Sequence, residues 1–449
     1  MGRLFGTDGI RGEANRYPMD AGVACSVGQA VVKIFKRPGH RTRVIIGRDT
    51  RISGYMLESS LEAGISSMGG ISYLAQILPT PGVAFIAESM RADAGIVISA
   101  SHNPFQDNGI KIFSGSGFKL YDEQEEEIEG LILNDKLSEL VPSAKDMGRS
   151  YRMKDAQGRY IVFLKNTFPR YLSMEDVKIV LDTANGATYK VGPAVFTELG
   201  ADVTAIHNHP DGLNINDNCG SQYTRSLEKT VVETGADMGL AFDGDGDRLI
   251  AVDEKGRTIT GDQILMICAK VLKDENRLSN ELLVGTVMSN LGLILACKKY
   301  GFKYHASKVG DRYVLEDMQK MGAVIGGENS GHMIFLEHHT TGDGVLAAIQ
   351  LVAAMIKEEK PLSELAAIMD IYPQVLINVD VKSKPEISTL PQVVEAIRQV
   401  ETELGDQGRV LVRYSGTQNM CRVMVEGQSD NITEKCCKQI AEAVKTAIG

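Results

Sequence analysis

Apolar residues along the chain recur in a strand–helix–strand pattern that appears three times. In each copy, a short β-branched run ends in a turn, a helix-like segment follows, and a second apolar run comes after it. The paired runs lie at 43–51 with 71–78, 178–188 with 202–206, and 283–293 with 303–307. Strands that alternate with helices indicate βαβ units and mostly parallel sheets. The pattern therefore predicts three similar mixed α/β domains.

A further apolar run follows each of these units and ends in an unusual polar loop. The three stretches read GIVISASHNP (95–104), MGLAFDGDGDR (238–248) and GAVIGGENSGH (322–332). In α/β sheets, ligands bind beyond the carboxyl ends of the strands. We therefore expect the three loops to converge on one cleft.

The pattern changes near residue 372, where a smaller α+β domain is expected. A strand at 374–383, an amphipathic helix at 388–404, two strands around a turn at 408–427 and a final helix at 431–448 are predicted. The turn RYSGTQNMCR (413–422) is its polar feature. The predicted domains, which carry the four loops in order, are 1–152, 153–256, 257–371 and 372–449.

Composition narrows the class of protein. The chain has 449 residues, which is more than one hydrophobic core usually supports, so several domains are expected. Its net charge of −10 argues against binding to nucleic acid or to an anionic membrane. The seven cysteines include no CxxC pair, which suits a reduced compartment. The first residues lack the apolar region of a signal peptide, and no apolar run reaches the length of a membrane span. We therefore expect a cytoplasmic protein with no nucleic-acid or membrane partner.

The second polar loop is typical of a metal site. Asp243, Asp245 and Asp247 alternate with glycines, and three carboxylates this close repel one another unless a cation lies between them. Oxygen ligands favour Mg²⁺, Ca²⁺ or Mn²⁺. An EF-hand would place Glu254 at position 12, but Arg248 stands at position 6, where that loop requires glycine, and both flanks resemble strands. A surface acidic turn is the other alternative to a metal site.

The first polar loop holds Ser101 next to His102, which raises the alternative of a serine hydrolase. Adjacent residues on an extended chain point to opposite sides, so we expect His102 not to serve Ser101 as a base, and the GxSxG elbow is absent. A plain turn would also accommodate these residues. Beside three metal-binding aspartates, however, the serine hydroxyl would be an oxygen ligand that can carry a phosphate.

The other two loops point to sugar and phosphate. Glu328 and Ser330 can hydrogen-bond vicinal hydroxyls, although such loops are often only turns. The fourth loop offers two guanidinium groups, two hydroxyls and backbone N–H groups, which together make a phosphate clamp or, alternatively, a simple hairpin turn. Its candidate phosphate-binding residues are Arg413, Ser415, Gly416, Thr417 and Arg422.

Five motifs in order, TDGIRG, SASHNPFQDNGIK, DGDGDR, GENSGH and RYSGTQNMCR, make the whole chain resemble the α-D-phosphohexomutase superfamily. The resemblance implies a four-domain enzyme in which Ser101 carries a phosphoryl group and, with the three aspartates, holds one Mg²⁺. The ENSGH form and VGDRYVLE (309–316) favour the member that acts on glucosamine phosphates and supplies cell-wall precursors. Members that act on glucose or mannose phosphates are the alternative.

The resemblance also implies roles for the remaining residues. Glu328 and Ser330 would bind sugar hydroxyls, and the fourth loop would bind the non-reacting phosphate. The further polar residues expected to line the cleft are Arg11, His102, Lys111, Arg248 and His332, with Arg11, Lys111 and His332 as catalytic candidates. The clamp departs from the commoner RPSGTEP pattern at Tyr414, Gln418 and Asn419.

A homodimer and activation by glucosamine or glucose 1,6-bisphosphate are implied by the same resemblance. Two alternatives of a different class stay open, namely a calcium-binding protein and a sugar-phosphate sensor, neither of which would turn over a substrate.

Overall fold

The computed structural model describes residues 4–6, 8–134, 136–137, 139, 141–415 and 419–449. The chain divides into two compact units. The first consists of Met1–Val287 and Lys303–Ala367, and the second of Met288–Phe302 and Ile368–Gly449. The four domain boundaries expected from the sequence stay a prediction.

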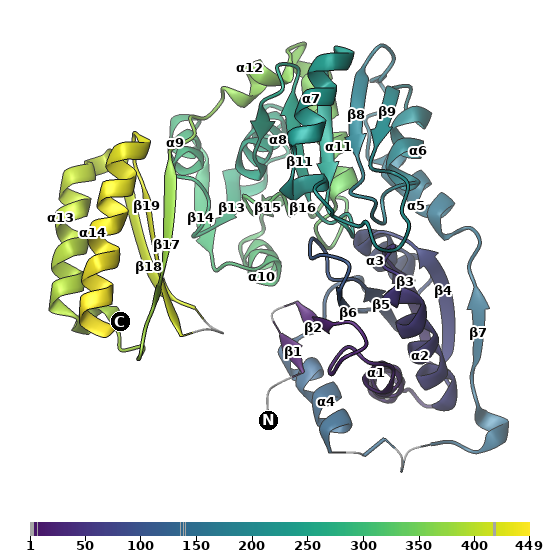
Figure 1. The fold of residues 1–449 in the computed structure, drawn as a ribbon. Helices are drawn as coiled ribbons and strands as arrows, with labels where there is room; N and C mark the ends of the chain where they lie inside the picture. The colour runs from purple at the N-terminus through teal and green to yellow at the C-terminus, as the bar shows by residue number, and fades with distance from the viewer. Residues whose placement is uncertain (1–3, 7, 135, 138, 140, 416–418) are drawn as a thin grey trace. The chain divides into compact units, whose positions relative to one another are not determined.

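The first unit contains three sheets, which Figure 1 shows in order along the chain. The first has the strand order β1-β2-β6-β5-β3-β4-β7. Its strands are β1 (Phe5–Gly6), β2 (Gly9–Glu13), β3 (Arg43–Arg48), β4 (Ile71–Ile77), β5 (Ala94–Ile98), β6 (Asp107–Ser114) and β7 (Arg149–Arg152). The accompanying helices are α1 (Ala21–Ile34), α2 (Ser53–Ser67), α3 (Thr80–Ser89) and α4 (Asp122–Leu133).

The second and third sheets have the orders β12-β11-β10-β8-β9 and β14-β13-β15-β16. Their strands are β8 (Lys178–Asp182), β9 (Asp202–Ile206), β10 (Met238–Phe242), β11 (Leu249–Asp253), β12 (Thr258–Ile259), β13 (Leu282–Thr286), β14 (Lys303–Ser307), β15 (Ile325–Gly327) and β16 (Met333–Phe335). The helices are α5 (Ala156–Asn166), α6 (Val191–Glu198), α7 (Arg225–Thr234), α8 (Gly261–Asp274), α10 (Asp311–Met321), α11 (Gly344–Glu358) and α12 (Leu362–Ala366).

One four-strand arrangement is common to all three sheets. A first strand (β3, β8 or β13) has a parallel neighbour on each side, and an antiparallel strand (β6, β11 or β16) lies beyond one of them. The predicted threefold repeat and the mostly parallel sheets are thus confirmed. Each polar loop joins the third strand of its repeat to the antiparallel strand, so all three loops lie at the carboxyl ends of buried strands.

Close packing of α1 against α2 fixes one face of the first sheet. A Cβ atom at Gly28 would lie 2.5 Å from the carbonyl oxygen of Leu61, and one at Gly64 would lie 2.0 Å from that of Cys25. Only glycine permits this approach. The two helices cover a buried aliphatic core, and that core holds β3 and β5, which end at the site, in fixed register.

The second unit is a three-stranded antiparallel sheet with two long helices on one face, as Figure 1 shows. Its elements are α9 (Leu291–Lys299), β17 (Gln374–Asp380), α13 (Pro391–Leu404), β18 (Arg409–Tyr414), β19 (Met420–Glu426) and α14 (Asp430–Ile448). The strand order is β17-β19-β18, and the expected smaller α+β domain is confirmed. Its core packs valines of the sheet against α13 and α14.

Two further features bear on the sequence expectations. No helix within the described ranges combines the length and the apolar character that a membrane crossing requires. None of the seven cysteines, all of which lie in the described ranges, forms a disulfide bond.

Candidate active site

A hydrogen bond joins the loops of the first two sheets. Ser101 is almost completely buried, and its Oγ donates to Oδ2 of Asp243 at 2.6 Å. Ser101 lies in a turn that the N–H of Asn103 closes on the carbonyl of Ala100, and its φ angle is +53°. This left-handed backbone is unusual for a residue other than glycine, and it directs the hydroxyl toward the aspartate loop.

The aspartate loop forms a buried cage of oxygen atoms. Asp243, Asp245 and Asp247 are all buried, and one carboxylate oxygen from each lies within 4.8 Å of the others. Among the described residues, Oδ1 of Asp245 and Oδ1 of Asp247 are buried without a hydrogen-bond donor. Unpaired buried carboxylate oxygens are costly unless a cation pairs with them, so the cage fits a divalent ion with oxygen ligands.

The charge state of Asp243 supports the same interpretation. Burial, together with the neighbouring carboxylates of Asp247 and Asp245, raises the pKa of Asp243 well above its ordinary value. A cation among the three groups would remove the repulsion that causes this shift. Two protein cations already lie at the edge of the cage, Lys111 and Arg248.

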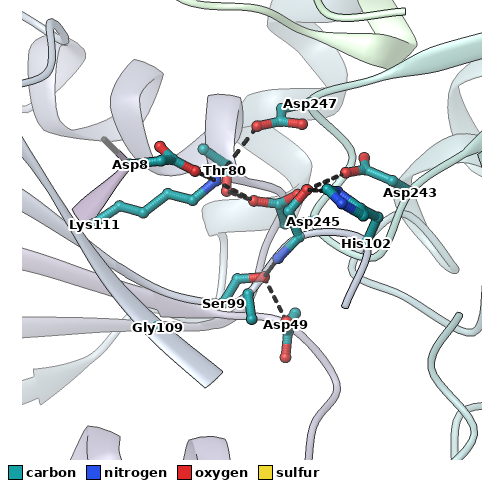
Figure 2. Close-up of polar contacts among 12 residues, drawn as sticks. Asp8, Asp49, Thr80, Ser99, His102, Gly109, Lys111, Asp243, Asp245 and Asp247 are labelled. Carbon is teal, nitrogen blue, oxygen red and sulfur yellow. Dashed lines mark hydrogen bonds and ion pairs between the residues drawn. The ribbon is translucent and has the colours of Figure 1, made fainter. Parts of the chain in front are cut away.

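Lys111 places a positively charged side chain among the carboxylates of the site, as Figure 2 shows. Its buried Nζ lies 2.9 Å from Oδ2 of Asp245, 3.4 Å from Oδ2 of Asp247 and 3.2 Å from Oδ2 of Asp8. Burial alone would lower the pKa of Lys111, but these carboxylates outweigh it and hold the pKa well above its ordinary value. Lys111 is therefore an ammonium group at neutral pH.

The loop of the third sheet packs directly on the aspartate loop. Nδ1 of His332 lies 3.6 Å from Oδ2 of Asp247, and its Nε2 lies 3.5 Å from Oδ2 of Asp311. A Cβ at Gly331 would lie 2.1 Å from the carbonyl oxygen of Leu249, so only glycine permits this contact. Burial opposes the charged imidazole, but the carboxylate of Asp247 prevails and raises the pKa of His332.

The two sugar-binding candidates lie together in this third loop. Oγ of Ser330 donates to Oε2 of Glu328 at 3.3 Å. The N–H of Gly310 donates to Oε1 of the same carboxylate at 2.9 Å. Glu328 is thereby oriented by the residue before α10. Burial alone would lower the pKa of Arg248, but the charges of Asp247, Asp243 and then Glu328 raise it above its ordinary value.

The expectation that Ser101 and His102 point apart is wrong. Nδ1 of His102 lies 3.3 Å from Oγ of Ser101, because the left-handed turn at Ser101 removes the alternation of an extended strand. Burial and the charges of Arg248 and Arg11 lower the pKa of His102 to about 4. The imidazole is therefore neutral at physiological pH. Arg11 approaches the same turn, with Nη1 at 3.5 Å from the carbonyl of Ala100.

The fourth loop brings two like charges together within the second unit. Arg413 and Arg422 are direct partners across β18 and β19. Burial and the charge of Arg422 lower the pKa of Arg413, and Nε of Arg422 is buried without an acceptor among the described residues. Like charges directly opposite on a sheet destabilise it, so this pair suits an anion. Gly416 and Thr417 lie outside the described residues.

Sequence reasoning missed Asp8 and Thr80 beside the aspartate cage and, within the second unit, Lys384 beside the fourth loop. Asp8 accepts from both Arg11 and Lys119 at 2.5 Å, and Thr80 donates its hydroxyl to Oδ2 of Asp245 at 2.6 Å. In the second unit, Nζ of Lys384 donates to the carbonyl of Ser415 at 2.8 Å. Asp8 belongs to the quoted TDGIRG motif and could have been found there, whereas nothing local marks Thr80 or Lys384.

A second cluster of ligand-type residues has a structural explanation. Asp182, His207 and Cys219 place their polar atoms within 4.8 Å of one another. Both oxygens of Asp182 are already used, because Oδ1 accepts from the N–H of Ala184 and Oδ2 from that of Gly220, each at 2.9 Å. Burial, together with nearby carboxylates, raises the pKa of the Cys219 thiol to about 12. The cluster therefore ties loops together.

Comparison with known families defines the class of protein. Four domains of the phosphoglucomutase/phosphomannomutase family match the chain in order and together cover most of it. They are alpha/beta/alpha domain I (residues 2–139), domain II (158–256), domain III (260–372) and the C-terminal domain (376–443). The order of these four domains agrees with the order of the five sequence motifs. The four matches together show that the protein is a phosphohexomutase.

Comparison with individual proteins narrows the class. The chain is 73% identical to a phosphoglucosamine mutase of Syntrophobacter fumaroxidans, with all of both chains covered. It is 63% identical, again over the whole of both chains, to a phosphoglucosamine mutase of Syntrophus aciditrophicus. The chain belongs to the phosphoglucosamine mutases of the phosphoglucomutase/phosphomannomutase family, and is thus an isomerase that transfers phosphoryl groups.

Solved structures share the fold. A phosphoglucomutase/phosphomannomutase family protein of Burkholderia thailandensis has a TM-score of 0.81 at 23% identity, covering 99% of this chain and 97% of that one. An N-acetylphosphoglucosamine mutase of Aspergillus fumigatus, in complex with GlcNAc-6P and magnesium, has a TM-score of 0.68 at 16% identity, covering 99% and 96%. At these identities the likeness concerns the fold alone.

Proposed function

We propose that this protein interconverts glucosamine 6-phosphate and glucosamine 1-phosphate through a phosphorylated Ser101. One observation carries the proposal: the hydroxyl of Ser101, from the first sheet, contacts Asp243 of an oxygen cage from the second sheet at 2.6 Å. A hydroxyl beside a buried cation cage is suited to accept and release a phosphoryl group. The high identity to proteins named phosphoglucosamine mutase supports the choice of sugar.

The reaction proceeds through two phosphoryl transfers, one from Ser101 to the sugar and one from the sugar back to Ser101. In the first, the 1-hydroxyl oxygen of glucosamine 6-phosphate forms a bond to phosphorus as the bond from phosphorus to Oγ of Ser101 breaks. The sugar hydroxyl loses its proton, and the serine oxygen gains one. The 1,6-bisphosphate then reverses its orientation, so that its 6-phosphate faces Ser101. In the second transfer, Oγ of Ser101 forms a bond to the phosphorus on O6 as the bond from O6 to phosphorus breaks. The serine hydroxyl loses its proton, O6 gains one, and glucosamine 1-phosphate leaves.

Positioning and charge neutralisation supply most of the catalysis in phosphoryl transfer. We propose Mg²⁺ as the ion that Asp243, Asp245 and Asp247 hold together with an oxygen of Ser101 or its phosphate. When bound, the ion would neutralise charge on the phosphoryl group and stabilise the departing serine oxygen. Lys111 adds a permanent positive charge from the protein, because its three carboxylate contacts favour the ammonium form.

Proton transfer is assigned to groups beside the cage. Lys111, as an ammonium group, is suited to donate a proton. His332 has an imidazole nitrogen near each of Asp247 and Asp311, and it is the second proposed proton carrier. Arg11, held by Asp8, is proposed to contact the phosphoryl group. His102 is proposed to stay neutral beside Ser101.

Substrate binding is assigned to the third and fourth loops. Glu328 and Ser330 are proposed to bind sugar hydroxyls, and Arg413, Ser415 and Arg422 to bind the non-reacting phosphate. We also propose Gly416 and Thr417 for this phosphate. A 1,6-bisphosphate is proposed as the compound that first phosphorylates Ser101. A homodimer is proposed from the family resemblance, and a cytoplasmic location is proposed because the seven cysteines form no disulfide bond.

Intact-mass analysis before and after incubation with glucosamine 6-phosphate and Mg²⁺, coupled to detection of glucosamine 1-phosphate, tests the proposal. We expect one phosphate per chain, mapped to Ser101, and formation of the 1-phosphate. Rates on glucosamine, glucose and mannose phosphates measured in parallel decide the preferred sugar. Turnover without any phosphorylated Ser101 would overturn the phosphoenzyme mechanism.

A further inference from the structure

The turn that carries Ser101 is held through its backbone by two side chains from different sheets. Nη2 of Arg51, which follows β3 in the first sheet, donates to the carbonyl oxygens of Ser101 at 3.2 Å and Asn103 at 2.5 Å. Nδ2 of Asn216, from the segment after β9 in the second sheet, donates to the same two oxygens, each at 2.9 Å. Two donors thus share two acceptors.

This shared contact acts on a strained part of the backbone. A left-handed residue other than glycine costs about 1–2 kcal/mol and persists only where its surroundings require it. Ser101 adopts this conformation with φ at +53°. Its carbonyl faces the two donors while its Oγ faces Asp243. A relaxed turn would redirect the hydroxyl.

Arg51 is suited to this task because the carboxylate of Asp49 holds its guanidinium group in place. Its side chain is completely buried, and Nη1 pairs with the carboxylate of Asp49. Asp49 also accepts from Oγ of Ser99 at 2.5 Å, and Oγ of Ser99 in turn accepts from the N–H of Ser101 at 3.0 Å. Figure 2 shows Asp49 and Ser99 next to each other, below the three cage aspartates in this view.

A buried guanidinium group seldom stabilises a fold more than apolar residues of the same size would. Its desolvation is costly, and here the charge serves one turn and one carboxylate. Its position is therefore better explained by the conformation it imposes on the Ser101 turn than by the stability of the fold.

We propose that Arg51 and Asn216 are positioning residues for phosphoryl transfer at Ser101. Among the described residues, their side chains hydrogen-bond neither to Oγ of Ser101 nor to the cage carboxylates. Instead they hold the carbonyls of residues 101 and 103, which fixes the turn in the conformation that aims the hydroxyl at the cage. Because Asn216 lies in the segment that follows β9 of the second sheet, the reactive conformation depends on that segment being docked on the Ser101 turn. The inference rests on the proposed function of Ser101.

The main test compares Asn216→Gly with Asn218→Gly. Both asparagines have a positive φ, +59° and +52°, which glycine adopts without strain. The side chain of Asn218 donates to Oδ1 of the exposed Asp217 instead of reaching the Ser101 turn. The pair therefore differs in the amide contact to the turn, while the backbone effect is matched.

We expect Asn216→Gly to lower kcat about 10- to 100-fold, the scale on which a misplaced reacting group costs rate. KM, the affinity for Mn²⁺ as a probe ion and the melting temperature should match those of Asn218→Gly. The phosphorus NMR signal of phosphorylated Ser101 should shift or broaden only in Asn216→Gly. Equal kcat values and equal spectra for the two variants would overturn the inference.

A second pair tests the other donor. Arg51→Lys keeps a charge for Asp49 but offers one compact donor, whereas Arg51→Met removes the charge. Among variants that remain folded by circular dichroism, kcat should fall in the order wild type, Arg51→Lys, Arg51→Met, with KM little changed. A change in KM alone would contradict the positioning role.

Wild-type behaviour separates this inference from the proposed function. If wild-type protein carries no phosphate on Ser101 and makes no 1-phosphate, the proposed function fails. If wild-type protein does both, and Asn216→Gly behaves like Asn218→Gly, only the positioning role fails.

Discussion

The hydroxyl of Ser101 lies 2.6 Å from the carboxylate of Asp243, although 142 residues separate them along the chain. Phosphorylation of this hydroxyl would add a charge of about −1.5 to −2 beside three buried carboxylates. Lys111 supplies one compensating charge, and a cation could supply more at the oxygens of Asp245 and Asp247 that accept no hydrogen bond from the described residues. Ser101→Ala and Asp245→Asn each test one part of this balance.

Ser101→Ala should abolish turnover while sugar-phosphate binding remains measurable. The substitution removes the oxygen on which we propose that the phosphoenzyme forms, but it leaves the proposed sugar-binding residues of the third loop and the arginine pair intact. Mutase rate and calorimetric binding of glucosamine 6-phosphate provide the two measurements. Ser116→Ala, at an exposed serine beyond β6, is the matched control and should behave as wild type. Normal turnover by Ser101→Ala would exclude the phosphoserine mechanism.

Asp245→Asn should weaken binding of a divalent ion at least about tenfold, as expected when a carboxylate ligand in a compact site loses its charge. Thr80 and Lys111 both hold Oδ2 of Asp245, and its Oδ1 is the oxygen left without a donor. Calorimetric titration with Mn²⁺ measures the affinity directly. Turnover should fall severely, and excess Mg²⁺ should not fully restore it. Asp274→Asn, on the surface of α8, should leave the titration unchanged.

The motif residues of the first unit could be predicted from the sequence because each motif brings its functional groups together within a few consecutive residues. Three aspartates separated by glycines indicate a cation cage, and the repeat of strands and polar loops indicated that the loops share one end of the sheets. The structure brings Ser101, Asp243, Asp247 and His332 together in this way. Only one of the three antiparallel fourth strands, the one that follows DGDGDR in the second repeat, could be predicted from the sequence. Short buried strands carry little hydrophobic pattern of their own.

The remainder depended on contacts that no local pattern encodes. Asp8 and Thr80 reach the cage through tertiary packing, and neither residue type is rare enough to stand out. The relation of Ser101 to His102 was predicted wrongly, because a left-handed turn was not foreseen. That turn depends on Arg51 and Asn216, which lie 50 and 115 residues away from Ser101.

Arg422→Gln should weaken phosphate binding without lowering the melting temperature. Arg413 and Arg422 repel each other as direct cross-strand partners, and removing one of them relieves a conflict that only an anion would otherwise balance. We expect KM for the sugar phosphate to rise at least about tenfold, since a charge-assisted hydrogen bond contributes roughly 1.5–3 kcal/mol. Affinity for Mn²⁺ should be unchanged. Arg398→Gln, which disrupts an exposed pair with Glu395, is the control.

The stability of the fold should depend on pH through Asp343. This buried carboxyl group begins α11, where Oδ1 accepts from the N–H of Leu346 at 2.9 Å and Oδ2 accepts from the hydroxyl of Tyr160 at 2.7 Å. Burial raises its pKa from 3.8 to about 7. Between these values the native protein holds the proton more firmly than the unfolded chain. The stabilising contribution is therefore complete below about pH 4 and is lost as the pH rises through about 7.

Asp343→Asn removes this titration, because an amide keeps the shape of the carboxyl group and cannot ionise. The melting temperature of the wild-type protein relative to Asp343→Asn should therefore fall as the pH rises from about 5 to 8. Differential scanning calorimetry of both proteins across this range measures the effect. Glu395→Gln, at an exposed carboxylate on α13, should follow the wild-type curve in shape. Parallel curves for wild type and Asp343→Asn would show that the proton on Asp343 is bound equally in the folded and unfolded states.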